Sequence, residues 1–198
     1  MKRMWLLSVC MLAVGLAGGW YAARWHGQPV KPTETDKAQA LQEAVARDGP
    51  LDMLDWLVGD WVSADDEVTA EFSCDYTKNG SFLFRPFRIV KKNGEPFSGT
   101  QLIAWDPANE TIRSWTFDSN GGFGEESWSQ SGDRYTIRAK YTLPDGGIAS
   151  AVHILTNIDE NKCMWKSVNR EIDGQFQPDV DEVVIIRKQD SNDAKGGK

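Results

Sequence analysis

The chain has 198 residues, a length that suits one domain with flanking segments. Nine tryptophans and eighteen glycines favour an all-β domain with a substantial core. The formal net charge is −7; residues 1–27 contribute +3, so subtracting this from −7 leaves −10 for the rest. An acidic body without a basic stripe argues against nucleic acid as a partner and against electrostatic docking on anionic lipid.

Residues 1–27 have the composition of a targeting or anchoring segment. Lys2 and Arg3 precede an uncharged apolar run from Met4 to Ala23. As a signal peptide, this run would end at the small residues 17–19. As a membrane helix, it has about the twenty residues that span a bilayer. Because the run continues past the cleavage site, we favour an uncleaved anchor in the inner membrane. Both interpretations place the rest of the chain outside the cytoplasm, on the periplasmic face or secreted.

Residues 28–50 are predicted to be a linker and a short helix. Pro29 and Pro32 favour an extended segment. Asp36 then caps a predicted helix over Lys37–Arg47, which Gly49-Pro50 ends. A second helical turn is expected over residues 51–57. At the other end of the chain, the polar residues 189–198 predict a disordered tail.

From Trp61 onward the apolar residues alternate with a period of two. In Glu67–Tyr76, for example, every second residue from Val68 to Tyr76 is apolar or aromatic, which predicts a half-buried strand. Turn signals such as Asn79-Gly80 separate the strands. Besides the strand at Trp61, we expect strands over residues 67–76, 81–91, 97–105, 111–118, 123–129, 134–143, 148–157, 163–171 and 181–188. About ten antiparallel strands joined by short turns predict a sandwich or a barrel.

Gly59 and Trp61 at the first strand, with Arg187 near the end of the last, resemble the pattern of lipocalin-like (calycin) β-barrels. The resemblance implies that Arg187 packs across the Trp61 ring and closes the barrel. It also implies a ligand cavity toward the opposite end.

A longer stretch is similar to a more specific family. The residues are Gly99-Thr100-Gln101, Trp105-Asp106-Pro107, Ile112-Arg113-Ser114-Trp115, Phe117-Asp118-Ser119 and Gly122-Phe123-Gly124-Glu125. They resemble an uncharacterised lipocalin-like domain of secreted or membrane-anchored bacterial proteins, over residues 51–188. In relatives this domain often follows a polyketide-cyclase-like (SnoaL-like) domain. Residues 28–50 are too few for such a domain, so no activity is transferred from it.

The candidate ligand-lining residues are the aromatic side chains of the middle strands and the only histidine of the predicted barrel. They are Trp105, Trp115, Phe117, Phe123, Trp128, His153 and Trp165. An apolar pocket and a solid aromatic core both fit this composition. His153 lies on a late strand, where haem-binding barrels of the nitrobindin type carry their iron ligand. No second ligand or attachment motif accompanies His153, so we expect no cofactor and a structural histidine.

Two further groups of residues bear on chemistry. Cys74 and Cys163 lie in strands that are not neighbours in a meander, so we expect buried free thiols rather than a disulfide. No nucleophile elbow, P-loop or zinc-ligand spacing occurs, which argues against an enzyme and predicts no metal site. The expected function is binding of a small apolar ligand without catalysis. An enzyme for a small hydrophobic substrate and a filled-barrel envelope scaffold remain alternatives.

Overall fold

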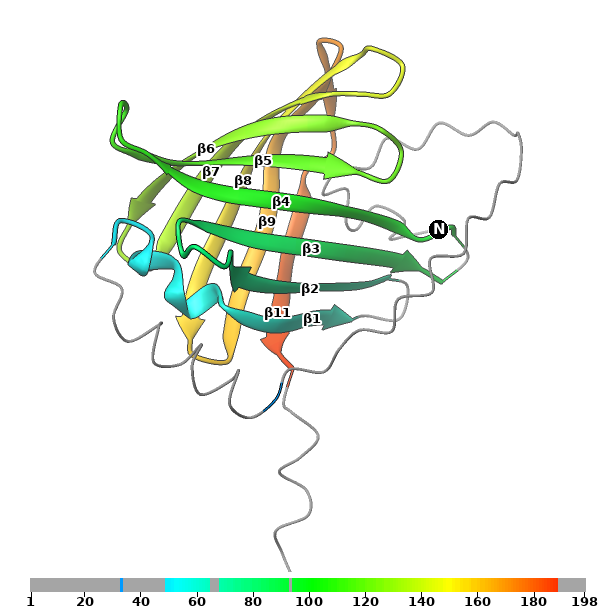
Figure 1. Cartoon of the computed structure of the whole chain (residues 1–198). Coiled ribbons are helices and arrows are strands. Elements are labelled where there is room, and N and C mark those ends of the chain that lie inside the picture. The colour runs from blue at the N-terminus through cyan, green and yellow to red at the C-terminus, as the bar shows by residue number, and fades with distance from the viewer. Residues whose placement is uncertain (1–32, 34–48, 65–67, 93, 189–198) are drawn as a thin grey trace, which may run out of the picture.

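The computed structural model describes residue 33 and residues 49–64, 68–92 and 94–188. A 3-10 helix, η1 (Asp52–Leu57), precedes the strands (Figure 1). The strands are β1 (Gly59–Ala64), β2 (Val68–Tyr76), β3 (Phe82–Lys91), β4 (Phe97–Asp106), β5 (Thr111–Asp118), β6 (Phe123–Ser131), β7 (Arg134–Thr142), β8 (Ile148–Asp159), β9 (Lys162–Ile172), β10 (Gln175–Gln177) and β11 (Val180–Arg187).

Ten of these strands form a closed antiparallel barrel. From β1 to β9 each strand pairs with the next along the chain, and β11 closes the circle between β9 and β1. The short β10 pairs with β9 beyond the part that β11 covers. The prediction of an all-β barrel of about ten strands is therefore confirmed. The sequence did not predict β10, which lies between the strands expected over residues 163–171 and 181–188.

The strands form where apolar and polar residues alternate, because successive side chains point to opposite faces of a sheet. On β7, Tyr135, Ile137, Ala139 and Tyr141 are buried. Strand β6 alternates in the same way, with Gly124, Glu126 and Trp128 buried. The barrel interior thus receives one face of each strand, and on β6 that face includes a glutamate.

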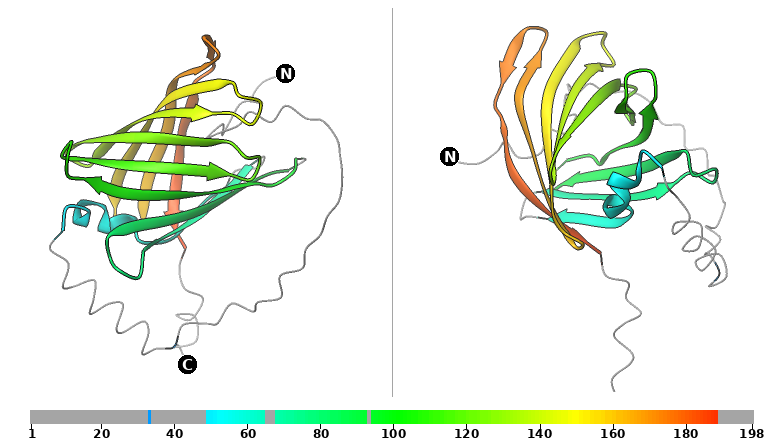
Figure 2. Two further views of the ribbon diagram at one scale, coloured as in Figure 1. Left: turned by 45° about the horizontal axis from the view of Figure 1, so that its top comes forward. Right: turned by 90° about the vertical axis from the view of Figure 1, so that its left-hand side faces the viewer.

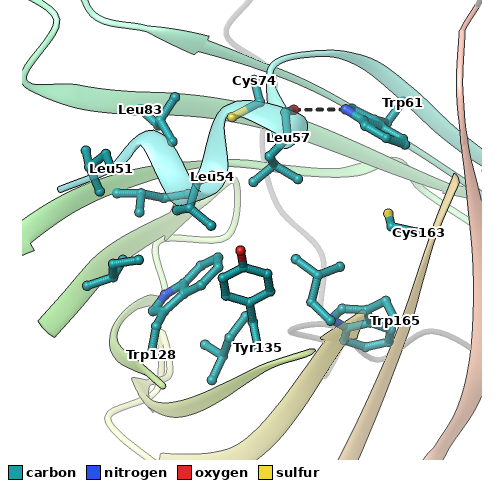
Figure 3. Close-up of a cluster of buried hydrophobic side chains, with 14 of the residues drawn as sticks. Leu51, Leu54, Leu57, Trp61, Cys74, Leu83, Trp128, Tyr135, Cys163 and Trp165 are labelled. Atoms are coloured by element: carbon teal, nitrogen blue, oxygen red, sulfur yellow. Dashed lines mark hydrogen bonds between the residues drawn. The ribbon is translucent and has the colours of Figure 1, made fainter. Parts of the chain in front are cut away.

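The helix η1 lies across one end of the barrel (Figure 2). Its side chains Leu54 and Leu57, with Leu51 just before it, are buried in the core cluster. Figure 3 shows them pointing toward Trp128 and Tyr135. Three buried leucines contribute about 1.5–3 kcal/mol each by removing apolar surface from water. This end of the barrel is therefore filled.

Trp61 and Arg187 join the first and last strands beside η1. They are directly opposite in the β1–β11 register, and the guanidinium carbon of Arg187 lies 4.3 Å from the ring centre of Trp61. The guanidinium also donates hydrogen bonds to the backbone carbonyls of Trp56, Val58 and Glu160. The indole Nε1–H of Trp61 donates to the carbonyl of Leu57 at 2.9 Å (Figure 3). These contacts connect η1, β1, β11 and the β8–β9 turn.

Several predictions fall on residues outside the described ranges. The segment 1–27, the predicted helix over Lys37–Arg47 and the tail 189–198 all lie there. Among the residues that the structure describes, no helix has the length and apolar character to cross a membrane.

Cys74 and Cys163 are both buried free thiols, as predicted. Burial raises the pKa of each thiol to about 12. Both thiols are therefore protonated at neutral pH.

Candidate functional site

A layer of polar side chains crosses the barrel interior beyond the apolar end that η1 fills. Its buried members are Ser63, Gln101, Ser114, Thr116, Glu126, His153 and Ser167. They come from β1, β4, β5, β6, β8 and β9. Burial of so many polar groups is unfavourable unless they are hydrogen-bonded. The hydrogen-bond partners therefore show which of these groups are satisfied within the protein and which could bind a ligand.

Glu126 is the centre of the best-satisfied part of the layer. One carboxylate oxygen accepts from the Gln101 side-chain amide and the Ser114 hydroxyl. The other accepts from Thr116 Oγ1 at 3.1 Å and from the Tyr141 hydroxyl at 2.7 Å. Four donors from three strands, β4, β5 and β7, therefore surround one carboxylate. Hydrogen bonds to charged groups are the stronger kind, so this cluster links β4, β5, β6 and β7.

Arg85 places a positive charge in the wall of the interior. It lies on β3, directly opposite Gln101 in the β3–β4 register. Its guanidinium carbon is 4.8 Å from the ring centre of Phe72. The Nε atom is buried and has no hydrogen-bond partner among the described residues. The Oε1 atom of Gln101 is also buried without a partner in this part of the chain.

Both residues line an interior cavity of about 80 Å³. A single water needs about 10–15 Å³, so this space admits a group of several atoms. Its polar wall includes Arg85, Gln101, Glu126, Tyr141 and His153. The apolar wall is formed by Phe72, Phe87, Ile89, Ile137, Leu155, Trp165, Val183 and Ile185.

His153 lies on β8 and faces this cavity. Its Nδ1 is 3.1 Å from the Ser167 hydroxyl, and its ring packs on Trp165 with 5.4 Å between ring centres. Burial is the main cause that lowers the pKa of His153 to about 4. The negative charge of Glu126 raises this pKa, and the positive charge of Arg85 lowers it further. The imidazole is therefore neutral at pH 7.

A second cavity, of about 60 Å³, is lined by residues at the strand ends away from η1. Its wall includes residues of the β7–β8 turn, such as Leu143 and Pro144, and Ile172 at the end of β9. Tyr141 and His153 line both cavities. These two side chains therefore separate the interior cavity from the barrel end that η1 leaves open.

The aromatic residues proposed as ligand-lining do not all lie in the barrel. His153 and Trp165 line the interior cavity. Trp105 and Trp128 pack in the core, and the Trp128 indole donates to Ser114 Oγ at 2.8 Å.

The interpretation of Trp115, Phe117 and Phe123 as cavity residues is wrong. Phe117 and Phe123 are 57% and 51% exposed and are cross-strand neighbours on the outer face. Trp115 shares that face with Arg113, whose guanidinium carbon is 5.5 Å from its ring centre. The inner face of β5 instead carries Ile112 and the two hydroxyl residues that donate to Glu126. Aromatic character therefore did not indicate the buried face.

Arg85, Gln101, Glu126 and Tyr141 were not identified as site residues from the sequence. For Glu126 a signal was present, because it alternates in step with Trp128 on one strand. For Arg85 the corresponding signal is that it alternates with Leu83 and Phe87 on β3, which places all three side chains on the same face. Both charges lie where the alternation predicts an apolar residue.

The residues around the cavity do not fit a haem or a metal ion. A cavity of about 80 Å³ is smaller than the roughly 300–1,000 Å³ of sites for drug-sized ligands, so it does not fit a haem beside His153. No group of three or more His, Cys, Asp or Glu residues that could hold a metal ion occurs within the described ranges. We derive no chemistry through either group.

No protein-family model matches this chain, and no curated protein matches it.

Proposed function

We propose that the barrel binds one small ligand in its interior cavity and does not transform it. The observation that carries this proposal is the guanidinium of Arg85, which faces the cavity and has no ion pair with any described residue. Arg85 is half-buried, and its Nε–H is a buried donor without an acceptor among the described residues. Such a donor is unfavourable, and a ligand that accepts a hydrogen bond from it would remove the penalty. The cavity is therefore a binding site with a defined polar end.

The shape and lining of the cavity set the kind of ligand. The apolar wall supports the expectation of a hydrophobic molecule, because binding would bury its surface against Phe72, Leu155 and Trp165. The polar wall adds a second requirement for the ligand, since one end of the ligand must accept a hydrogen bond from Arg85. With about 80 Å³ available, the ligand has few heavy atoms.

An enzyme is the second candidate, because Glu126 and His153 both line the cavity and could form an acid–base pair. Their hydrogen bonds favour binding instead. The Glu126 carboxylate already accepts from four donors. Ser167, the hydroxyl beside His153, is completely buried and lines neither cavity. Of the hydroxyls that do line the cavity, those of Thr116 and Tyr141 donate to Glu126, and Ser63 has no hydrogen bond to a base among the described residues. None of these hydroxyls is therefore paired with a base that would activate it as a nucleophile.

We also propose a protein family and a cellular location for this chain. The closed barrel is compatible with a calycin-type, lipocalin-like domain, and the Arg187–Trp61 contact supports that assignment. The basic start and apolar run of residues 1–27 support an extracytoplasmic protein tethered to the inner membrane. Fractionation of cells with and without detergent tests the location: release without detergent would favour a cleaved signal peptide.

Native mass spectrometry of the full chain, purified from its natural source, tests binding. The expected result is a one-to-one adduct of a small molecule that is lost on denaturation. Ala70 lines the cavity, so Ala70→Phe should abolish the adduct. Thr69→Phe places the same ring on the opposite face of β2 and should retain it. A wild-type protein without an adduct, or an adduct that survives in Ala70→Phe, would support a filled-barrel scaffold or a site elsewhere.

A further inference from the structure

The interior cavity contains one unsatisfied donor and one unsatisfied acceptor. The donor is Arg85 Nε and the acceptor is Gln101 Oε1, both buried and without partners among the described residues. The two residues are directly opposite on β3 and β4, and such pairs have Cβ atoms about 4.5–5.5 Å apart. One small group could therefore contact both.

The orientation of the Gln101 amide follows from its neighbours. Its Nε2 donates to the Glu126 carboxylate and to Ser114 Oγ at 3.3 Å. A flipped amide would place a carbonyl oxygen against a carboxylate, which is repulsive. Oε1 must therefore remain on the unsatisfied side, where it can only accept a hydrogen bond.

The charges that line the cavity indicate which polar groups the ligand carries. Two carboxylates line the cavity besides Arg85: Glu126 is surrounded by donors from four side chains, and Glu71 pairs with Lys188 at 2.7 Å. Arg85 stacks on the Phe72 ring and has no ion pair among the described residues. An anionic ligand would balance Arg85, and a carboxylate matches a guanidinium in geometry. A carboxylate alone cannot donate to Gln101 Oε1. A hydroxyl next to the carboxylate can.

We infer that the ligand is a short 2-hydroxycarboxylate with an apolar side chain. This inference rests on the proposed function and names the ligand class for the same cavity. The carboxylate accepts from Arg85, the 2-hydroxyl donates to Gln101 Oε1, and the apolar chain packs against Phe72, Leu155 and Trp165. The small cavity volume, about 80 Å³, restricts that chain to a few carbon atoms.

Isothermal titration of the full chain with a matched ligand series tests the inference. The series is 2-hydroxy-4-methylpentanoate, 4-methylpentanoate, which lacks the hydroxyl, and 4-methylpentane-1,2-diol, which lacks the carboxylate. We expect the hydroxy acid to bind at least about tenfold more tightly than either analogue. 4-methylpentanoate leaves Gln101 Oε1 unpaired, and the diol offers Arg85 no negative charge. Arg85→Met should remove the preference for the hydroxy acid over the diol, whereas Arg88→Met, at an exposed position of the same strand, should retain it.

Equal affinity for 4-methylpentanoate would overturn the role of Gln101, and equal affinity for the diol would overturn the role of Arg85. Unchanged selectivity in Arg85→Met would also overturn the inference. If no compound of the series binds, the ligand class is wrong, and the native mass measurement with Ala70→Phe decides separately whether the cavity binds any ligand. The wild-type ligand series does not depend on whether a variant folds.

Discussion

The guanidinium of Arg187 lies over the indole ring of Trp61 and at the same time donates to three backbone carbonyls of other segments. Trp61 in turn donates to the last residue of η1. The first strand, the last strand and the helix that fills the barrel end are therefore held by one pair of side chains. This contact closes the barrel at the end opposite the second cavity.

Replacement of Arg187 by Met should destabilise the fold by about 2–4 kcal/mol, because a cation–π contact and charged hydrogen bonds are lost together. Lys188→Met is the control, since the Lys188 side chain forms an exposed ion pair with Glu71 at 2.7 Å and its backbone hydrogen bond to Asp60 is kept in the variant. That pair contributes about 0–1 kcal/mol. Urea unfolding of both variants measures the difference. Equal losses in the two variants would contradict the closing role of Arg187.

Gly59→Ala should destabilise the protein more than Gly121→Ala. Both glycines have positive φ, 121° and 91°, so both substitutions introduce backbone strain of order 1–3 kcal/mol. A Cβ at Gly121 meets no atom within 4 Å, whereas one at Gly59 would overlap an Arg187 guanidinium nitrogen. The difference between the melting temperatures of the two variants measures the effect of that overlap. If the two melting temperatures fall equally, Arg187 does not require the glycine.

Glu126→Gln should lower the free energy of unfolding by about 2–4 kcal/mol, because an amide cannot accept from all four surrounding donors. Glu125→Gln is the matched control on the adjacent residue. Glu125 faces solvent and pairs with Arg113 at 2.6 Å, so its replacement should cost less than about 1 kcal/mol. A Glu126→Gln protein as stable as Glu125→Gln would show that the cluster is not fully formed.

Acid should destabilise the barrel through His153. Its pKa is about 4 in the folded protein and near the ordinary 6.5 when unfolded, so the unfolded state binds more protons between these values. Stability therefore falls as the pH decreases from 6.5 to 4, by on the order of 3 kcal/mol in total. In His153→Gln this part of the pH dependence should disappear. An identical pH profile in the variant would show that His153 is not buried in its neutral form.

The fold was largely predictable because alternation along the strands is a local signal. The boundaries expected for β2 and β5, for instance, agree with the structure to within one residue. The three residues of β10 carry no such pattern, since they pair only with the end of β9. The contact of Trp61 with Arg187 was expected from a family resemblance and not from spacing.

The site was less predictable because it depends on which residues the closed barrel brings together. Glu126 is buried because Gln101, Ser114, Thr116 and Tyr141 converge on it from other strands. Without these partners, a glutamate on a strand is expected to face solvent. The outward position of Phe117 and Phe123 has the converse cause: small hydroxyl residues occupy the inner face of β5.

We propose Arg85 as the polar anchor of an interior ligand site. Nitrogen-15 NMR of the Arg85 side chain tests it most directly, with the Nε–H signal assigned by its absence in Arg85→Lys. Addition of 2-hydroxy-4-methylpentanoate should shift this signal to a saturable limit, with the same affinity that calorimetry gives. A ligand that binds the full chain and leaves the Arg85 Nε–H signal unchanged would show that Arg85 does not anchor it.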